Sequence, residues 1–211
     1  VAILIRKGFL KAPKNKKIIN TNNNESVQRS HFLEYLLGKL LPKDKIVSTT
    51  GYASRELNQI RKNKKIFHGK DFYVVGGMGH ANSISLGLSV KSKNRVICID
   101  GDGSLLMHMG SIFSSAYYAK KNYKYIILNN SMHESTGGQK TFANRINFKK
   151  LSDALGFKNY FLIKNKKKFN LLNKFLKLDG PNFLEVKIRR GSIENLSRPK
   201  NLKKIVLDFI K

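Results

Sequence analysis

The sequence predicts an α/β fold: a doubly wound, mostly parallel sheet with helices on both faces. Short runs of β-branched and aromatic residues alternate with helix-length segments along most of the chain, which is the pattern of successive βαβ units. Several of these runs lead directly into glycine, serine, threonine, aspartate or asparagine. In a parallel sheet such strand ends share one edge, and ligands bind at that edge.

The domain organisation follows from composition. Residues 1–10 begin with an apolar stretch and are interpreted as the end of a preceding domain. Residues 11–26 are polar and charged and contain Pro13, which is typical of a linker. Residues 27–211 are long enough to bury one sizeable core and form the predicted α/β domain.

The first element of this domain is a predicted helix. Ser26 is expected to cap it, Arg29 to face solvent, and Pro42 to end it. Its apolar residues recur at helical spacing, so that one face packs on the sheet; they are Phe32, Leu33, Leu36, Leu37 and Leu40.

Strands and helices then alternate to the end of the chain. Strand-like runs occur at residues 46–51, 72–75, 95–99, 125–128, 160–163 and 182–188. The segments between and after them have helical character, and the helices are expected at 53–61, 81–90, 104–119, 151–155, 169–176 and 205–210.

The formal net charge of +28 raises the question of a nucleic-acid partner. The lysines are spread along the whole chain together with asparagine and isoleucine, a pattern that indicates AT-rich codon usage rather than a binding face. Zinc-finger spacing, a basic zipper and an RNP-like aromatic motif are all missing from the sequence. The sequence therefore argues against nucleic acid as the main partner, although the charge would attract an anionic substrate.

The number of cysteines and the length of the apolar runs indicate the cellular compartment of the protein. Cys98 is the single cysteine, so an internal disulfide cannot form, which fits a reducing compartment such as the cytoplasm. None of the apolar runs approaches the roughly 18 residues of a membrane span.

A Gly-Asp-Gly turn and an asparagine pair carry the most informative chemistry. Asp102 follows the strand at 95–99, and Asn130 follows the strand at 125–128, one helix and one strand later. These strand ends should lie side by side in a parallel sheet. A carboxylate and an amide oxygen at this place suit Mg²⁺, which takes its other ligands from phosphate and water.

Small residues at the same edge suit a phosphate group. Gly51, Gly101 and Gly103 would let backbone N–H groups approach a phosphate closely. Thr50 and Ser104 would add hydroxyl donors. Each feature alone has a plain structural explanation, since Gly-Asp-Gly is usually a turn and Met78 of the Gly-Gly-Met-Gly stretch could fill a core. The same holds for His80, His108 and His133, each of which could be structural.

Taken together, the stretches 48–57, 75–81, 100–110 and 128–139 resemble the phosphonopyruvate decarboxylases, which are thiamine diphosphate (ThDP) enzymes. The sulfopyruvate decarboxylases are similar as well, so a beta-type subunit of such an enzyme, or another ThDP-dependent 2-oxo acid decarboxylase, stays an open alternative. The resemblance covers nearly the whole chain. It implies the ThDP-binding fold and, within it, the domain that holds the cofactor's diphosphate (PP-type).

The resemblance also implies a cofactor site. Asp102, Asn130 and the main-chain oxygen of Met132 would ligate Mg²⁺. Gly76 would accept a hydrogen bond from the aminopyrimidine, and Met78 would bend the cofactor. The diphosphate would be held by Thr50, Gly51, Gly101, Gly103 and Ser104.

The implied reaction is decarboxylation of 3-phosphonopyruvate, an anionic 2-oxo acid, to phosphonoacetaldehyde and CO₂. His133 and Glu134 would be the catalytic candidates in this chain, and Ser135 and Gln139 would lie near the substrate. Arg55 could bind the phosphonate through its guanidinium fork, or it could pair with Glu56 or another acid.

The resemblance further implies a partner. The glutamate that activates the cofactor belongs to a pyrimidine-binding domain, normally of another subunit, and residues 27–211 hold no such domain. A homo-oligomer or an α/β hetero-oligomer is therefore expected, and the chain alone is expected to be inactive.

Overall fold

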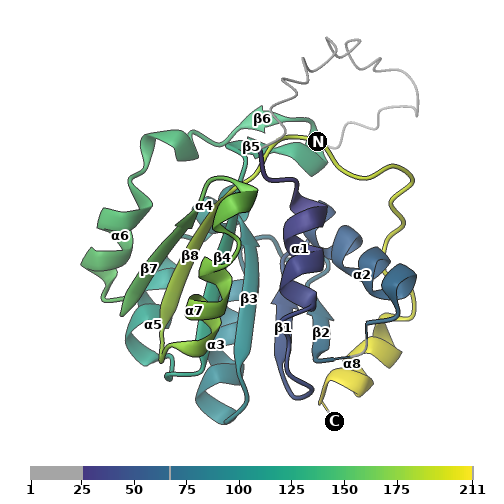
Figure 1. Ribbon diagram of the computed structural model, residues 1–211, viewed down its shortest axis with the longest axis horizontal. Helices are drawn as coiled ribbons and strands as arrows, with labels where there is room; N and C mark the ends of the chain where they lie inside the picture. Colours follow the sequence, from purple (N-terminus) through teal and green to yellow (C-terminus); the bar gives the residue numbers. More distant parts are fainter. Residues whose placement is uncertain (1–25, 67, 211) are drawn as a thin grey trace, which may run out of the picture.

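The structure is a computed structural model that describes residues 26–66 and 68–210 (Figure 1). The expected domain end at 1–10 lies outside the described residues, as does all of the expected linker except Ser26.

A six-stranded sheet forms the centre of the molecule, in the order β2-β1-β3-β4-β8-β7. Every neighbouring pair in this sheet is parallel. The chain moves outward in one direction from β1 and in the other from β3, which makes the sheet doubly wound and confirms the predicted fold class. The strands are β1 (Lys45–Ser48), β2 (Lys70–Tyr73), β3 (Val96–Gly101), β4 (Tyr123–Asn129), β7 (Asn159–Ile163) and β8 (Asn182–Lys187).

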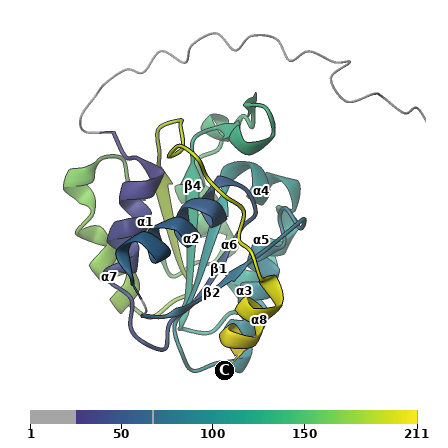
Figure 2. The ribbon, with the colours of Figure 1, turned by 90° about the vertical axis from the view of Figure 1, so that its right-hand side faces the viewer.

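Helices cover both faces of this sheet, as Figure 2 shows from the side. One face carries α1 (Arg29–Leu37), α2 (Tyr52–Lys64) and α7 (Leu171–Lys177). The other face carries α3 (Ala81–Lys91), α5 (Gly110–Tyr118) and α6 (Phe148–Leu155). The remaining elements are α4 (Asp102–Met107), α8 (Leu202–Ile210), the hairpin strands β5 (Met132–His133) and β6 (Gln139–Lys140), and the 3₁₀ turns η1 (Glu134–Thr136), η2 (Ala143–Arg145) and η3 (Lys166–Lys168).

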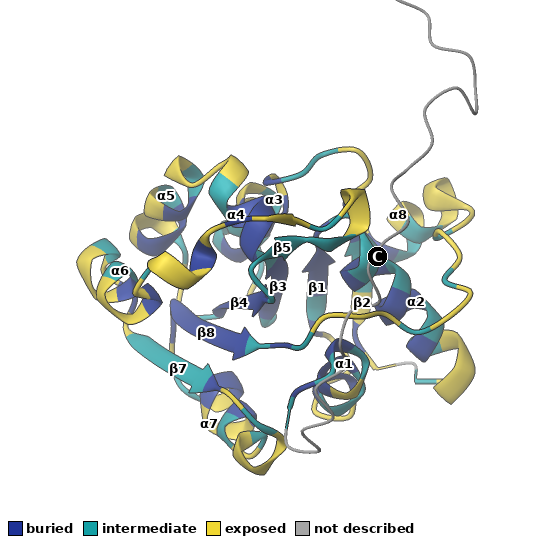
Figure 3. Cartoon of the chain, turned by 90° about the horizontal axis from the view of Figure 1, so that it is seen from above, coloured by how far each residue is buried: buried dark blue, intermediate teal, exposed yellow. Residues whose placement is uncertain are grey.

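The central strands are buried on both faces, because successive side chains of a strand point to opposite sides. In β3, Ile97 and Ile99 join the apolar layer under α1, while Val96 and Cys98 join the layer under α3 and α5. Seen from above, these strands form a buried band between more exposed helices (Figure 3). This packing holds the carboxyl ends of the strands together at one edge of the sheet.

Among the described residues, no helix is long and apolar enough to cross a bilayer.

The predictions for α1 were wrong at three points. Ser26 does not cap the helix; it forms an isolated bridge with Asn165, and Gln28 occupies the N-cap position. The helix ends at Leu37, with Gly38 as its C-cap, well before Pro42. Arg29 does not face solvent but is only 6% exposed. The bridges of residues 26 and 27 to later parts of the chain keep this stretch extended, so the helix begins after it.

The helix expected at 104–119 is two helices, α4 and α5. His108 has non-helical dihedral angles (φ −139°, ψ 46°) at the break. Gly79 packs against it so closely that a Cβ on Gly79 would lie 2.6 Å from the His108 Cβ. Gly110, a poor helix former, opens α5. The break therefore depends on a contact with a distant loop, which the local sequence does not show.

Asn147→Ala is expected to lower the free energy of unfolding by about 1 kcal/mol, because it removes an N-cap. The Asn147 side chain accepts a hydrogen bond from the Lys150 N–H at 3.0 Å, in the first turn of α6. Asn170→Ala is the matched control, because Asn170 precedes α7 without a capping bond. Urea unfolding of both variants checks this, and equal losses would contradict it.

Candidate functional site

A pocket lies at the carboxyl edge of the sheet, where the loops after β1, β3 and β4 meet near the β1/β3 switch point. It is a hollow open to solvent, and α1 and the loop after β2 complete its wall. Eleven residues predicted from the sequence line it: Thr50, Met78, Gly101, Asp102, Gly103, Ser104, Asn130, Met132, His133, Glu134 and Ser135. The lining also includes five residues that were not predicted as site residues: Arg29, Thr49, Tyr52, Ala53 and Leu128. The edge predicted from the strand ends is thus a real concave site.

Four predicted residues do not line this pocket. Gly51 is the N-cap of α2, with φ +97°, and a Cβ there would lie 2.9 Å from the Ser135 Oγ. Gly76 and Gln139 are exposed. Arg55 stacks its guanidinium 5.7 Å from the centre of the Tyr52 ring. Its suggested pairing with Glu56 is wrong, since Glu56 pairs with Arg29 instead.

Asp102 and Asn130 do lie side by side, as the parallel register of β3 and β4 requires. Gly101, directly before Asp102, is paired in that register with Leu128, two positions before Asn130. Asp102 accepts hydrogen bonds from the Asn130 N–H, at 3.3 Å, and from the Thr141 hydroxyl. Burial nevertheless raises the pKa of the Asp102 carboxyl above its usual range. No ion pair to Asp102 is recorded within residues 26–66 and 68–210, so a cation would stabilise its charge.

The oxygen donors around Asp102 fit a hard cation that is also bound by a ligand. The Asn130 Oδ1 accepts from the Met132 N–H at 3.0 Å and keeps a second lone pair. The described part of the chain has no group of three or more His, Cys, Asp and Glu residues that could hold a metal. A carboxylate and an amide oxygen fill only part of a coordination shell and would leave positions for phosphate oxygens and water, as Mg²⁺ prefers.

The neighbouring surface has room for a ligand. Gly101 borders the pocket, and a Cβ built on it would meet nothing within 4 Å. Gly103 is different, because a Cβ there would lie 2.4 Å from the His133 ring. Gly101 therefore leaves open space, whereas Gly103 lets His133 pack close to α4.

Ser104 ties three loops together at the base of the pocket. Its hydroxyl lies 2.8 Å from the Thr49 hydroxyl and accepts a hydrogen bond from the Gly79 N–H at 2.8 Å. Ser104 is buried and lines the pocket, so the same hydroxyl that borders the ligand space also fixes the surrounding loops.

The histidines separate into two groups. His133 is half-buried in β5 and lines the pocket. His80 and His108 are exposed and outside that lining, and their rings lie 4.9 Å apart. Only His133 of these three therefore faces the ligand space.

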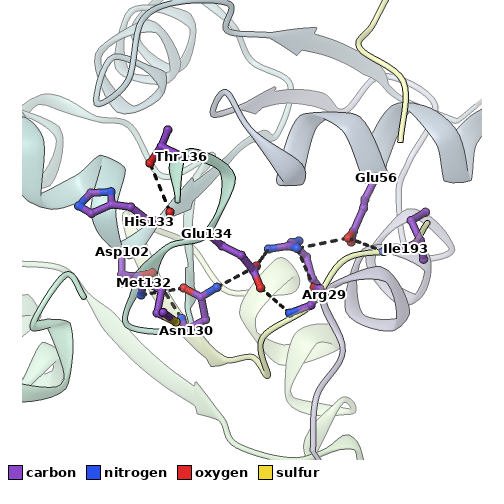
Figure 4. Close-up of polar contacts among 10 residues, drawn as sticks. Arg29, Glu56, Asp102, Asn130, Met132, His133, Glu134, Thr136 and Ile193 are labelled. Atoms are coloured by element: carbon purple, nitrogen blue, oxygen red, sulfur yellow. Dashed lines mark hydrogen bonds and ion pairs between the residues drawn. The ribbon is translucent and has the colours of Figure 1, made fainter. Parts of the chain in front are cut away.

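Arg29 forms a buried ion network that sequence reasoning missed (Figure 4). It donates to the Glu134 Oε2 at 3.0 Å, to the Glu56 Oε1 at 3.3 Å and to the Gly191 carbonyl at 3.0 Å. The sequence did hold a signal: Arg29 lies three, four and seven positions before Phe32, Leu33 and Leu36, and hence on the apolar face of α1.

Both carboxylate oxygens of Glu134 accept hydrogen bonds. Its Oε2 accepts from Arg29 and from the Asn130 amide, each at 3.0 Å, and its Oε1 accepts from the Gly191 N–H. The carboxylate therefore links the asparagine beside Asp102 to α1 and to the segment after β8.

Glu56 should make stability depend on pH. Burial raises the pKa of this carboxyl above its ordinary value of 4.5, in spite of Arg29. A raised folded-state pKa means that the folded protein binds the proton more tightly than the unfolded chain does. This contribution to stability is present below pH 4.5 and is lost as the pH rises through the folded-state pKa.

The check compares the wild type with Glu56→Gln, which cannot titrate. The free energy of unfolding of the wild type, minus that of the variant, is expected to fall as the pH is raised from 4 towards neutrality. Urea unfolding across that range measures the difference, and a constant or rising difference would contradict the assignment.

Comparisons with known proteins agree with this geometry. The sequence profile of the family described as "Thiamine pyrophosphate enzyme, C-terminal TPP binding domain" matches residues 49–186. A phosphonopyruvate decarboxylase of Streptomyces hygroscopicus is 37% identical over 169 residues, which are 80% of this chain and 41% of that protein. The chain thus spans about two fifths of the length of that relative.

Two further similarities come from a subunit and from a solved structure. The sulfopyruvate decarboxylase subunit beta of Methanothermobacter thermautotrophicus is 31% identical over 185 residues, covering 88% of this chain and 95% of the subunit. A structure described as a thiamin diphosphate-dependent enzyme from Mycobacterium smegmatis superposes with a TM-score of 0.61 at 16% identity. It covers 79% of this chain and 32% of its own, and it supports the fold alone.

Proposed function

Because the chain belongs to the family of thiamine pyrophosphate enzymes and contains its C-terminal TPP-binding domain, we propose that the pocket holds the diphosphate end of ThDP together with Mg²⁺. The observation that carries this proposal is the meeting of the β1, β3 and β4 loops at one hollow, with Asp102 beside Asn130. The residues of this pocket would form about half of an active site, and their role would be to bind and orient the cofactor.

The proposed roles follow the chemistry of each group. Asp102, the Asn130 amide and the Met132 main-chain oxygen would ligate Mg²⁺. The diphosphate would lie against the backbone of Gly101 and Gly103 and the hydroxyls of Thr50 and Ser104, beside Gly51 at the start of α2. When bound, ThDP supplies an electron sink for decarboxylation of a 2-oxo acid.

Other residues would position the cofactor and the substrate. Met78 would support the bend of the cofactor, and Gly76 would accept a hydrogen bond from its aminopyrimidine through the main chain. His133 is the proposed catalytic group of this chain, because it faces the pocket. Arg55, Ser135 and Gln139 would serve the anionic head of the substrate from the rim.

We propose 3-phosphonopyruvate as the substrate and phosphonoacetaldehyde and CO₂ as the products. Sulfopyruvate is the second candidate, because the chain covers 95% of a relative named as a sulfopyruvate decarboxylase beta subunit. Both substrates pair a 2-oxo acid with a tetrahedral anion.

A partner would complete the site with a pyrimidine-binding domain and its activating glutamate, in a homo-oligomer or an α/β hetero-oligomer. Exposed apolar side chains after β2 and on α4 and α5 are available for such a contact: Val75, Met107, Phe113, Tyr117 and Tyr118. The buried free thiol of Cys98 is compatible with a reducing cytoplasm.

A substrate panel tests the proposed function. The protein would be purified in its native assembly, with any partner chain, and supplied with ThDP, Mg²⁺ and 3-phosphonopyruvate, sulfopyruvate or pyruvate. Aldehyde release from 3-phosphonopyruvate is expected. Release from sulfopyruvate alone would favour the second candidate, and release from neither acid, with no ThDP binding, would contradict both.

A further inference from the structure

The side-chain amide of Asn130 has two ends of nearly equal shape, but only its oxygen can bind a cation. An amide that turned over would present NH₂ to the metal. The site proposed above therefore requires something that selects one orientation, and the following inference rests on that proposed function.

The contacts of Asn130 select the orientation at both ends. Its Nδ2 donates to the Glu134 Oε2 at 3.0 Å, and its Oδ1 accepts from the Met132 N–H at 3.0 Å. An ionised carboxylate only accepts hydrogen bonds, and a backbone N–H only donates. Turning the amide over would set oxygen against oxygen and N–H against N–H.

Glu134 is itself held in place. Arg29 donates to the same Oε2 at 3.0 Å, and the Gly191 N–H donates to Oε1. Arg29 is 6% exposed and is shared by the carboxylates of Glu134 and Glu56, so its charge is compensated and it is a poor receptor for a substrate anion. Figure 4 shows the continuous line of contacts from Glu56 through Arg29 and Glu134 to Asn130.

We propose that Glu134 is a positioning residue: it fixes the Asn130 amide with its oxygen available to the cation, and Arg29 holds Glu134 in that position. This role accounts for a carboxylate that lines the pocket while both of its oxygens accept hydrogen bonds from other parts of the protein. Residues that orient a metal ligand in this way typically contribute about 10–100-fold to metal affinity.

The test measures metal binding rather than turnover. Mn²⁺ would be titrated, as a probe for Mg²⁺, into the native assembly with saturating ThDP, and free Mn²⁺ would be followed by electron paramagnetic resonance. Glu134→Ala is expected to raise the Mn²⁺ dissociation constant about 10–100-fold. Glu134→Gln should restore most of the affinity, because its amide oxygen can still accept from both Asn130 and Arg29.

Glu56→Gln is the matched control. It also removes a carboxylate charge from Arg29, but Glu56 does not contact Asn130. Its Mn²⁺ affinity is expected to equal that of the wild type. Melting of the cofactor-free proteins separates a loss of stability from a loss of metal affinity.

Each outcome has a distinct meaning. Wild-type affinity in Glu134→Ala, or an equal loss in Glu56→Gln, would overturn the positioning role. If Glu134→Ala does not fold, Arg29→Lys takes its place, since a lysine keeps the charge but loses the fork that spans two carboxylates. The Arg29→Lys variant is expected to bind Mn²⁺ more weakly than the wild type. Unchanged binding would overturn the proposal. Failure of the wild type to bind Mn²⁺ and ThDP would instead refute the proposed function.

Discussion

Asp102→Asn is expected to weaken the binding of Mg²⁺ and ThDP by more than about 100-fold, which exceeds the 10–100-fold typical of residues outside the ligand shell. The substitution removes the only carboxylate among the proposed ligands and leaves a neutral amide in its place. Decarboxylation should fall with it. The shape and the acceptor oxygen are retained, so the hydrogen bond from the Asn130 N–H can persist.

Asp100→Asn is the control for this variant. Asp100 is also buried, two positions earlier, but its carboxylate accepts from the Gly101 N–H at 2.9 Å and from the Tyr125 hydroxyl at 3.1 Å. Calorimetric titration of ThDP, with and without Mg²⁺, compares the two variants. Retention of metal-dependent binding in Asp102→Asn would show that the metal assignment is wrong.

Arg29→Met is expected to lower the free energy of unfolding by about 3–5 kcal/mol, as is typical when one member of a buried ion network is removed. Glu56, at 1% exposure, and Glu134, partly buried at 14%, would be left without their cation. This loss is a large part of the roughly 5–15 kcal/mol that stabilises an ordinary domain.

Two comparisons identify the cause of that loss. Lys64→Met breaks the exposed pair between Lys64 and Glu34 and should cost about 0–1 kcal/mol. The double variant Arg29→Met with Glu56→Met should recover part of the stability, because it replaces a stranded charge by an apolar side chain. Urea unfolding measures all of them, and a loss below 1 kcal/mol in Arg29→Met would contradict the prediction.

The fold and the main part of the pocket could be predicted because their signals are local. The run of β-branched residues in β3 predicts a strand, and parallel pairing then brings the end of β3 beside the end of β4. Asp102 and Asn130 meet for that reason alone. The resemblance to ThDP enzymes added roles to residues that the strand pattern had already brought together.

The errors have a common physical origin in contacts between distant parts of the chain. Arg29 was expected in solvent because a lone arginine is usually exposed, yet it is buried by acids 27 and 105 positions away. The break between α4 and α5 occurs where Gly79 packs on His108. Neither partner can be identified from the neighbouring residues.

The link between Arg29 and Gly191 also bears on when the site can form. These residues are 162 positions apart, and Glu134 binds the same glycine. Contacts of such long sequence separation form late, since the intervening loop must first be closed. During synthesis, residue 191 follows β8, which is the last strand of the sheet along the chain. A nascent chain can therefore bury much of its sheet before Gly191 joins Arg29 and Glu134.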